Sequence, residues 1–483
     1  MRTAVPLVAA TAAASHLTAL RAGFVWLDHA HIEDRAALVE PGRLLHAFTH
    51  GFAGTGYYRP LVSLSLSLDA LVGGGPAVFH ATNLIFHAAA AAMTTAAASA
   101  LGLTRRAALF AGIVFAAHPL TGLVANAIAF RSEAMLAIAL LGLVWAHVRG
   151  RPLVAALAVV LGALTKETAF VLAPLFVVAL EIRRRPTSGI VTERTPRRLF
   201  AGEALAFAGC VALRSAYAPP WRASHEPLAM GDAIGTRLAS VGKSVAAVVL
   251  PVDRTICDAF PITSWWQPGA VAGLAVVIVI AILAWRERGI ALLLALALLP
   301  LLQIVPVTRW WSPHYLYLPL AFAAMRAAAF AEERLRERAT VVLGGAAALL
   351  GAISLYDGLR YASDALLWAP EVAHQPACRE AQFYLGEVER SAKRWDAAAK
   401  RYDAALVTNP RVVSFVDRGA ALQNLGVVRL EQHRFADARR VFSEALDGTK
   451  DPLRRRELTQ NLAAAAQGEG DDAEARRLLR AIE

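Results

Sequence analysis

The stretch FVWLDHAHIEDR, residues 24–35, places Asp28, Glu33, Asp34 and two histidines directly after an alanine-rich apolar run. Carboxylates and imidazoles can exchange protons with a bound molecule, and ionisable groups are costly at the depth of a lipid bilayer. Such groups at the end of an apolar run predict a functional cavity at the point where the chain leaves a membrane.

The same kinds of residue interrupt the later apolar runs. His118 and the pair Lys166–Glu167 lie inside runs that are otherwise apolar. A loop that is simply polar would account for Arg222 or Glu226, but not for these positions. The ionisable groups that the topology below places at outer span ends or in outer loops are Asp28, Arg59, His80, His118, Arg131, Glu133, Lys166, Glu167, Arg309 and His314. We expect Asp28, Arg131 and Lys166 to converge on one outward-facing cavity.

Membrane helices must position these residues, because the composition is too apolar for a soluble globular protein. Of the 483 residues, 57% are hydrophobic and 18% are charged, and the mean hydropathy is +0.45. The net charge of +11 does not indicate a nucleic-acid partner, because basic clusters such as residues 183–185 lie between apolar runs, as cytoplasmic anchors do. Cys210 falls in an apolar run, and the remaining Cys257 and Cys378 imply no disulfide framework.

Apolar runs of about 20 residues, the length that crosses a bilayer, recur along the first three quarters of the chain. With basic clusters taken as cytoplasmic, we predict about eleven spans, near residues 3–21, 78–102, 107–126, 132–148, 152–165, 168–182, 200–217, 269–285, 289–306, 314–330 and 339–356. This puts the N-terminus inside and the C-terminal domain outside. Residues 235–251 are expected to form a helix lying at the interface. The first run has an alternative interpretation as a cleaved signal peptide.

Two smaller patterns each allow two interpretations, a strand or a helix in the first and packing groups or a metal site in the second. Serines alternate with leucines over residues 63–67, which suggests a strand. An isolated strand at a membrane would have unpaired edges, so we expect an interfacial helix. His80, Asn83 and His87 share one helix face, which indicates packing polar groups more than a metal site.

The last quarter of the chain is charged and contains an internal repeat. The segment FYLGEVERSAKRWDAAAKRYDAALVTNP, residues 383–410, has the leucine–glycine, alanine, tyrosine and proline spacing of a tetratricopeptide repeat. A second copy begins at Leu425–Gly426, and a weaker third copy begins at Leu462–Ala463. The predicted domains are a polytopic membrane domain over 1–358, with an outer loop over 22–77, and a tetratricopeptide domain of about three repeats over 359–483.

Five longer motifs appear in a recognisable order: FVWLDHAHI, YYRPLVSLSLSLDALVGGGPAVFHATNLIFHAA, ALFAGIVFAAHPLTGLVANAIAFRSEAMLA, LGALTKETAFVLAP and SPHYLYLPLAF. Over nearly its whole length the chain resembles the transmembrane-and-tetratricopeptide O-mannosyltransferases and their bacterial relatives, which are glycosyltransferases of the GT-C fold. Leu27–Asp28 stands where family members generally have two adjacent acids, and His314 stands where an arginine usually precedes the tyrosine-rich motif. The resemblance implies an all-α fold, with a GT-C-type helical membrane domain followed by an α-solenoid.

The resemblance also implies inverting transfer of a sugar, such as the hexose mannose, from a polyprenyl-phosphate carrier. The acceptor is a hydroxyl of a protein or another envelope molecule on the periplasmic side of a bacterial inner membrane. The repeats would then be periplasmic and could recruit the acceptor. The partners are therefore the lipid-linked sugar, the acceptor and membrane lipids, and no cofactor is expected beyond the lipid-phosphate donor, which is a substrate.

The chemistry of this transfer assigns roles to the residues. A phosphate leaves as an anion without help from an acid, so one carboxylate suffices as general base for the acceptor hydroxyl. We predict Asp28 as the base, with Glu33 in reserve. Forked guanidinium groups suit a phosphate. The predicted substrate-binding residues are Arg59, Arg131 and Arg309 for the phosphate, Lys166 with Glu167 balancing its charge, His118 for orienting the acceptor or sugar, and Glu133 and His314 in the same cavity.

Three other functions fit parts of the pattern. A lipid-linked glycan ligase or polymerase would change the acceptor but keep the catalytic logic. A non-catalytic membrane anchor for a tetratricopeptide scaffold would need only one span. A transporter would favour ionisable groups near the bilayer midplane and two related halves, and the sequence lacks such internal symmetry.

Overall fold

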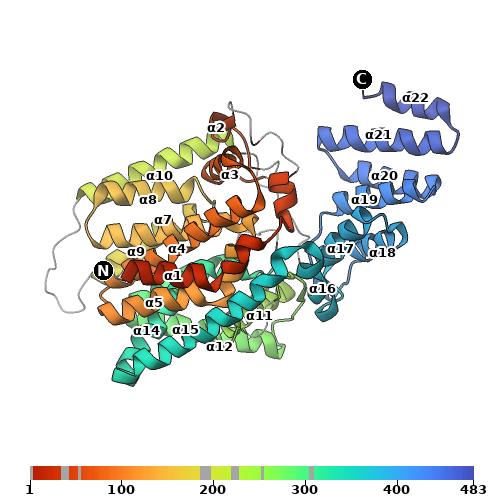
Figure 1. Ribbon diagram of the computed structural model, residues 1–483. Coiled ribbons are helices and arrows are strands. Elements are labelled where there is room, and N and C mark those ends of the chain that lie inside the picture. Colours follow the sequence, from red (N-terminus) through yellow and green to blue (C-terminus); the bar gives the residue numbers. More distant parts are fainter. Residues whose placement is uncertain are drawn as a thin grey trace. The chain divides into compact units, whose positions relative to one another are not determined.

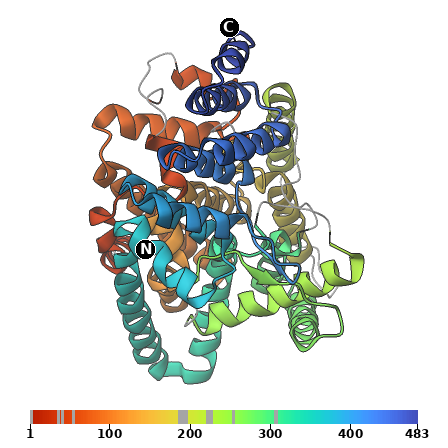
Figure 2. The same ribbon diagram turned by 90° about the vertical axis from the view of Figure 1, so that its right-hand side faces the viewer.

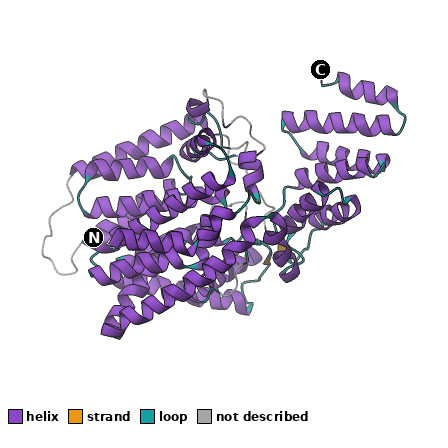
Figure 3. Ribbon diagram, in the orientation of Figure 1, coloured by secondary structure: helices purple, strands orange, loops and turns teal. Residues whose placement is uncertain are grey.

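The computed structural model describes residues 4–33, 38, 43–52, 56–184, 197–218, 228–251, 255–303 and 309–482. Within these residues the fold is nearly all-α, with one two-stranded sheet (Figure 3). The chain forms two compact units. Unit 1 comprises Met1–Ile256, Thr263–Val307 and Ser312–Ser363, and unit 2 comprises Cys257–Ile262, Thr308–Trp311 and Asp364–Glu483.

Unit 1 is built from α-helices joined by short 3₁₀ and π segments. Its elements are α1 (Ala4–Ser15), η1 (Leu17–Arg21), the π-helix η2 (His29–Glu33), α2 (Arg43–His46), α3 (Pro60–Val72), α4 (Pro76–Ala100), α5 (Arg105–Ala117), η4 (Pro119–Thr121), α6 (Gly122–Asn126), η5 (Ile128–Phe130), α7 (Arg131–Val148), α8 (Pro152–Ala163), α9 (Ala169–Arg184), α10 (Arg197–Tyr217), α11 (Met230–Val249), α12 (Pro268–Glu287), α13 (Ile290–Ala297), η6 (Leu299–Leu302), η7 (Pro313–Leu316), α14 (Tyr317–Leu335), η8 (Arg336–Arg338), α15 (Ala339–Gly358) and η9 (Leu359–Ala362).

Helix α4 lies at the centre of unit 1, with α1, α5 and α7 packed along it (Figure 1). Small residues permit this close packing. Ala90, Ala91, Ala97 and Ala98 of α4 are fully buried. A Cβ atom at Gly112 of α5 would collide with the Thr95 side chain of α4. Helices that associate without a hydrophobic driving force rely on such small-residue contacts.

Four helical segments among the described residues are long and apolar enough to cross a membrane: Ile128–Val148, Arg197–Tyr217, Pro268–Glu287 and Pro313–Ala362. A fifth is added if the bent pair α5 and η4–α6, which meet at 57°, counts as one span. This agrees with a multi-pass membrane protein. The number is below the expected eleven partly because three expected spans fold as shorter apolar helices, namely Ala4–Ser15, Pro152–Ala163 and Ile290–Leu302. Two further expected spans, 314–330 and 339–356, fall within the one segment Pro313–Ala362.

Several local expectations can be compared directly with the helices. The serine–leucine alternation folds as helix α3, so the predicted helix is confirmed. The run over 152–182 divides around Lys166–Glu167 into α8 and α9, as predicted. The run over 107–126, expected to be one span, bends where Pro119 follows His118, because proline cannot continue a helix with its missing N–H. Arg336, with φ 50°, separates α14 from α15, which lie side by side as a hairpin (Figure 2).

Unit 2 consists mainly of helical hairpins stacked in chain order (Figure 1). Its elements are β1 (Phe260–Pro261), α16 (Asp364–His374), α17 (Arg379–Ser391), α18 (Trp395–Leu406), β2 (Val412–Val413), α19 (Arg418–Glu431), α20 (Phe435–Gly448), α21 (Pro452–Gly468) and α22 (Asp472–Arg480). Glycines allow the helices of each pair to approach. Tyr402 of α18 lies against Gly386 of α17, and Phe442 of α20 lies against Gly426 of α19, so that an added Cβ atom would collide with either ring.

Two segments from between the helices of unit 1 are built into unit 2. Residues 257–262 follow α11, and β1 within them pairs with β2 in antiparallel register, Phe260 opposite Val413. Cys257 forms a disulfide with Cys378, whose Cα atoms are 6.0 Å apart across 121 residues of sequence. The expectation that these cysteines imply no disulfide framework is therefore wrong. Cysteine spacing alone did not reveal a pair so distant in sequence.

Candidate functional site

Asp28 lies in a tight turn that η5 completes. Its backbone N–H donates to the Val25 carbonyl, and its side-chain Oδ2 accepts from the Val25 N–H at 3.3 Å. Oδ1 accepts from the Ala129 N–H at 2.7 Å. These bonds hold Trp26 at φ 58°, with its buried ring 4.8 Å from the Phe130 ring. The side chain of Asp28 thus joins the 25–33 segment to the start of α7.

Asp28, which was expected to face an outward-facing cavity, is completely buried among protein groups. Burial raises the pKa of Asp28 to about 7, although hydrogen bonds from the Ala129, Val25 and Ile128 backbones partly oppose the rise. In the described part of the chain, Asp28 has no salt-bridge partner. It is therefore a carboxylate whose protonation changes near neutral pH, which is the property of an effective general base.

Arg131 begins α7, and all three of its guanidinium nitrogens are occupied. Nε donates to Asn83 at 2.6 Å, Nη1 donates to Ser65 at 3.2 Å, and Nη2 donates to the Phe79 carbonyl at 2.9 Å. Nη2 also pairs with Asp69 at 2.6 Å, and the Arg131 side chain has no exposed surface. Such an arginine joins α3, α4 and α7. A phosphate bound by Arg131, as predicted, would therefore have to displace one of these partners.

Glu133, two residues further along α7, receives two basic partners. Lys166 Nζ donates to Glu133 Oε1, and His314 Nε2 lies 3.7 Å from the same oxygen. The other ring nitrogen of His314 hydrogen-bonds to Ser312 Oγ at 2.6 Å, and the His314 ring lies 4.7 Å from the Phe130 ring. Glu133 therefore links α7 with the 164–168 turn and the segment before α14.

Arg59 precedes α3 and forms a bidentate pair with Glu167. Nε and Nη2 donate to the two carboxylate oxygens at 3.1 and 2.6 Å, and the Tyr57 ring lies 4.2 Å from the guanidinium carbon. Burial alone would raise the pKa of Glu167, but the charge of Arg59, its hydrogen bonds and the Lys166 charge together lower that pKa to about 2. Among the described residues no hydrogen-bond partner meets Arg59 Nη1, and the side chain is 12% exposed. One edge of the guanidinium thus remains available.

The structure connects most of the predicted site residues. We call this set the ionic cluster: Asp28, Arg59, Asp69, Arg131, Glu133, Lys166, Glu167 and His314. The links are the pairs described above, together with charge interactions between Arg131 and Asp28, Arg59 and Glu133, and Glu167 and Lys166. Segments that are far apart in sequence therefore bring these side chains to one region of unit 1.

Three predicted site residues are not connected to the ionic cluster. His118 caps η4, accepting from Leu120 N–H at 3.2 Å and donating to the Val248 carbonyl at 3.0 Å. Arg309 belongs to unit 2, where Nη2 pairs with Glu380 at 2.5 Å. Glu33 is the last residue of η2, and its side chain lies outside the described residues. The predicted roles of these three residues remain predictions.

Sequence reasoning did not single out Asp69. It lies four residues after Ser65, on the same face of α3, and both side chains contact Arg131. Asp69 also accepts from Thr82 of α4 at 2.7 Å. An acid within an apolar helix, one turn from a serine, is the signal that could have identified it. His80 and His87 hydrogen-bond to protein carbonyls, at Gly23 and Ala116 respectively.

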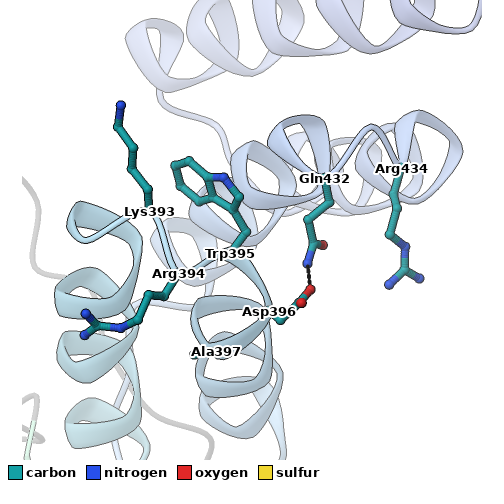
Figure 4. A pocket seen from close by; sticks show the side chains of 7 residues that line it. All are labelled: Lys393, Arg394, Trp395, Asp396, Ala397, Gln432 and Arg434. Carbon is teal, nitrogen blue, oxygen red and sulfur yellow. Dashed lines mark hydrogen bonds between the residues drawn. The ribbon is translucent and has the colours of Figure 1, made fainter.

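Unit 2 has a separate shallow hollow of about 670 Å³ at the turns that join α17 to α18 and α19 to α20 (Figure 4). Its lining residues are Lys393, Arg394, Trp395, Asp396, Ala397, Gln432 and Arg434. Gln432 donates to Asp396 at 2.6 Å, while Arg394 pairs with Glu389 and Arg434 pairs with Asp437. Two of the four charged side chains that line this hollow are therefore already paired with an acid.

Comparison with known proteins gives a partial similarity. The chain is 36% identical over 115 residues to the protein O-mannosyl-transferase Tmtc2 of Drosophila melanogaster, and this covers 22% of the chain and 12% of that relative. It is 32% identical over 116 residues to TMTC2 of Mus musculus, covering 22% of the chain and 14% of that relative. No protein-family profile matches the chain, and no solved structure is significantly similar. The matched regions thus span about one eighth of each relative's length.

Proposed function

We propose that this protein is a membrane glycosyltransferase that moves a sugar from a polyprenyl-phosphate carrier to an acceptor hydroxyl. The observation that carries the proposal is the partial similarity to two proteins named O-mannosyl-transferases. The ionic cluster supports it, because so many buried charges in an apolar unit are expensive and are typical of a functional site. The donor, the acceptor and the stereochemistry are part of the proposal.

Asp28 is the proposed general base. Its carboxylate accepts hydrogen bonds from the Val25 and Ala129 N–H groups, with a further contribution from the Ile128 backbone. A carboxylate has about four lone-pair sites, so one can still accept from an acceptor hydroxyl. Asp28 takes the hydroxyl proton while the acceptor oxygen forms its bond to the anomeric carbon of the sugar. The bond from that carbon to the phosphate oxygen breaks, and the electron pair leaves with the phosphate.

Arg59 is the proposed ligand of the phosphate. The guanidinium is held on one edge by Glu167, and its Nη1 donors remain available, so it can bind an anion without losing its own partner. Arg131 has no such free edge. Its proposed role is to position α7, which presents Glu133, and the preceding η5, whose Ala129 N–H binds Asp28.

The proposal extends to the topology and to unit 2. About eleven spans would place the C-terminal helices on the periplasmic side of a bacterial inner membrane, and the Cys257–Cys378 disulfide supports an oxidising compartment for them. The stacked hairpins with a glycine facing an aromatic ring support a tetratricopeptide array. We propose that this array recruits the acceptor.

The test is a transfer assay with the full-length protein in lipid nanodiscs. Radiolabelled polyprenyl-phosphate mannose and a serine- and threonine-rich peptide are supplied, and label on the peptide is measured. We expect transfer by the native protein and by Glu444→Gln, whose exposed pair with Arg418 lies in unit 2, but a large loss in Asp28→Asn. Absence of transfer by the native protein with any polyprenyl-phosphate sugar would reject the proposal and favour a scaffold.

A further inference from the structure

Helix α12 is the most apolar membrane-crossing candidate, and apart from the narrow face that packs against α11 most of its surface is exposed. The mean hydropathy of its apolar 18-residue stretch is 2.4, and only 17% of that stretch is buried. Its 20 residues are about 30 Å long, which equals the thickness of the hydrocarbon core of a bilayer. The exposed face includes Val271, Ile278 and Ile282. A surface of this kind fits lipid chains.

Exposed tryptophans mark both ends of α12. Trp265 and Trp266, just before the helix, are 59% and 65% exposed, and Trp285, in its last turn, is 74% exposed. The Arg288 guanidinium lies 5.2 Å from the Trp285 ring. Tryptophans at both ends of an apolar helix are typical of the two membrane–water interfaces, and nearby arginines are typical of the cytoplasmic one.

The turn that presents Trp265 and Trp266 is held in place by several contacts. Ser264 Oγ donates to Asp232 of α11 at 2.5 Å, and its N–H donates to Gln267 Oε1 at 3.2 Å. The Trp265 ring rests against Gly231, and the two indoles meet edge to face with centroids 5.7 Å apart. Both rings are therefore exposed by a fixed turn.

The disulfide identifies which interface this is. Cys257 lies eight residues before Trp265 in the chain and is bonded to Cys378. A disulfide of this kind forms in an oxidising compartment. Arg286 and Arg288 stand at the opposite end of α12. The disulfide indicates that the N-terminal end of α12 faces the oxidising compartment. The arginines independently indicate that its C-terminal end faces the cytoplasm.

We propose that α12 crosses the membrane with Trp265 and Trp266 anchored in the lipid headgroup layer of the oxidising side. Trp285 and the arginines beside it mark the cytoplasmic headgroup layer. The partner of this surface is the phospholipid bilayer itself. The proposal does not depend on the catalytic activity.

Tryptophan quenching by brominated phospholipids tests the depth of the anchor. The native protein and the double variant Trp265→Phe, Trp266→Phe are placed in nanodiscs whose lipids are brominated near the headgroup or near the chain end. We expect the double variant to lose part of the emission that headgroup-proximal bromines quench. The buried Trp368 of unit 2 provides the control Trp368→Phe, which should leave the quenched emission unchanged.

A double variant that behaves like Trp368→Phe would place the indoles outside the lipid and overturn the proposal. Stronger loss with bromines near the chain end would also overturn it, because the anchor would then lie too deep. Orientation is tested with Trp266→Cys and Arg286→Cys and a membrane-impermeant maleimide in intact cells. We expect labelling of the first but not the second before permeabilisation, and the reverse pattern would refute the orientation.

Discussion

The ionic cluster of unit 1 and the hairpin surface of unit 2 use charged residues in opposite ways. In unit 1 the pairs Arg131–Asp69 and Arg59–Glu167 have side chains that are at most 19% exposed. In unit 2 the pair Arg418–Glu444 joins side chains that are 53% and 41% exposed. Exposed ion pairs of this kind lose little hydration and contribute little to the free energy of unfolding. Buried pairs must repay a large desolvation cost, so their presence in an apolar unit is weak evidence that they stabilise the fold.

The apolar contacts differ as well. In unit 2 a glycine on one helix receives an aromatic ring from the next, as Gly426 receives Phe442. In unit 1 the central helix α4 is packed mainly through alanines. Unit 2 is therefore stabilised by aromatic rings packed against glycines, while unit 1 combines alanine packing with a few networks of polar side chains. The following substitutions test this difference, from the largest expected effect to the smallest.

Asp28→Asn should lower sugar transfer by about 10²–10⁴-fold, because an amide cannot accept the proton of the acceptor hydroxyl. The measurement is initial transfer rate in nanodiscs, with Glu444→Gln in unit 2 as a charge-matched control that keeps the native rate. The amide group also offers only one acceptor to the two N–H groups that Asp28 binds, so a small loss of thermal stability should accompany the loss of activity. Native transfer by Asp28→Asn would exclude it as the base.

The pH dependence of transfer gives a second test of Asp28. The base must be deprotonated, so with a pKa of about 7 the rate should fall about tenfold per pH unit below 7 and level off above it. The stability effect has the opposite sign. Because the pKa is raised from 3.8 on folding, the folded state binds the proton more tightly, and this contribution to stability is lost as pH rises through 7. A rate that does not change between pH 5 and pH 8 would contradict this role.

Asp69→Asn should destabilise unit 1 by about 3–5 kcal/mol, because Arg131 would keep a buried charge without a carboxylate partner. Thermal unfolding in detergent measures the effect. The double variant Asp69→Asn, Arg131→Gln should recover part of the loss, since it removes the uncompensated charge. A loss below about 1 kcal/mol in the single variant would mean that water or another group already compensates Arg131.

Gly426→Ala should destabilise unit 2 by about 1–3 kcal/mol, because the new methyl group would force the Phe442 ring out of its position. Gly448 is the matched control, since it ends α20 and a Cβ atom there would meet nothing within 4 Å. Gly448→Ala should leave stability nearly unchanged. Equal melting temperatures for the two variants would show that the helices of unit 2 do not depend on close contact.

Glu444→Gln should change the stability of unit 2 by less than about 1 kcal/mol, because its pair with Arg418 is exposed to solvent. The same thermal melt, repeated at low and high salt, measures the effect. The native protein should lose the small difference at high salt. An effect as large as that of Asp69→Asn would remove the contrast between the two units.

Much of the local structure could be predicted from the sequence. The all-α class, the division at Lys166–Glu167 and the helix over the serine–leucine alternation follow from patterns that repeat within one or two turns. Local patterns also indicated which ionisable residues are unusual, because a charge inside an apolar run is visible without coordinates. The glycine and aromatic positions of residues 383–410 were recognisable for the same reason.

Only the tertiary structure decided which of these residues are partners. Arg131 is saturated by Asp69, Asn83 and Ser65, while Nη1 of Arg59 meets no hydrogen-bond partner among the residues that the structure describes, although the two arginines look alike in sequence. Asp28 is buried by a segment 101 residues away, and Cys257 meets Cys378 across 121 residues. Periodicity and charge act over a few neighbouring residues. Burial and pairing depend on which distant segments pack together, and that choice is made by the whole chain.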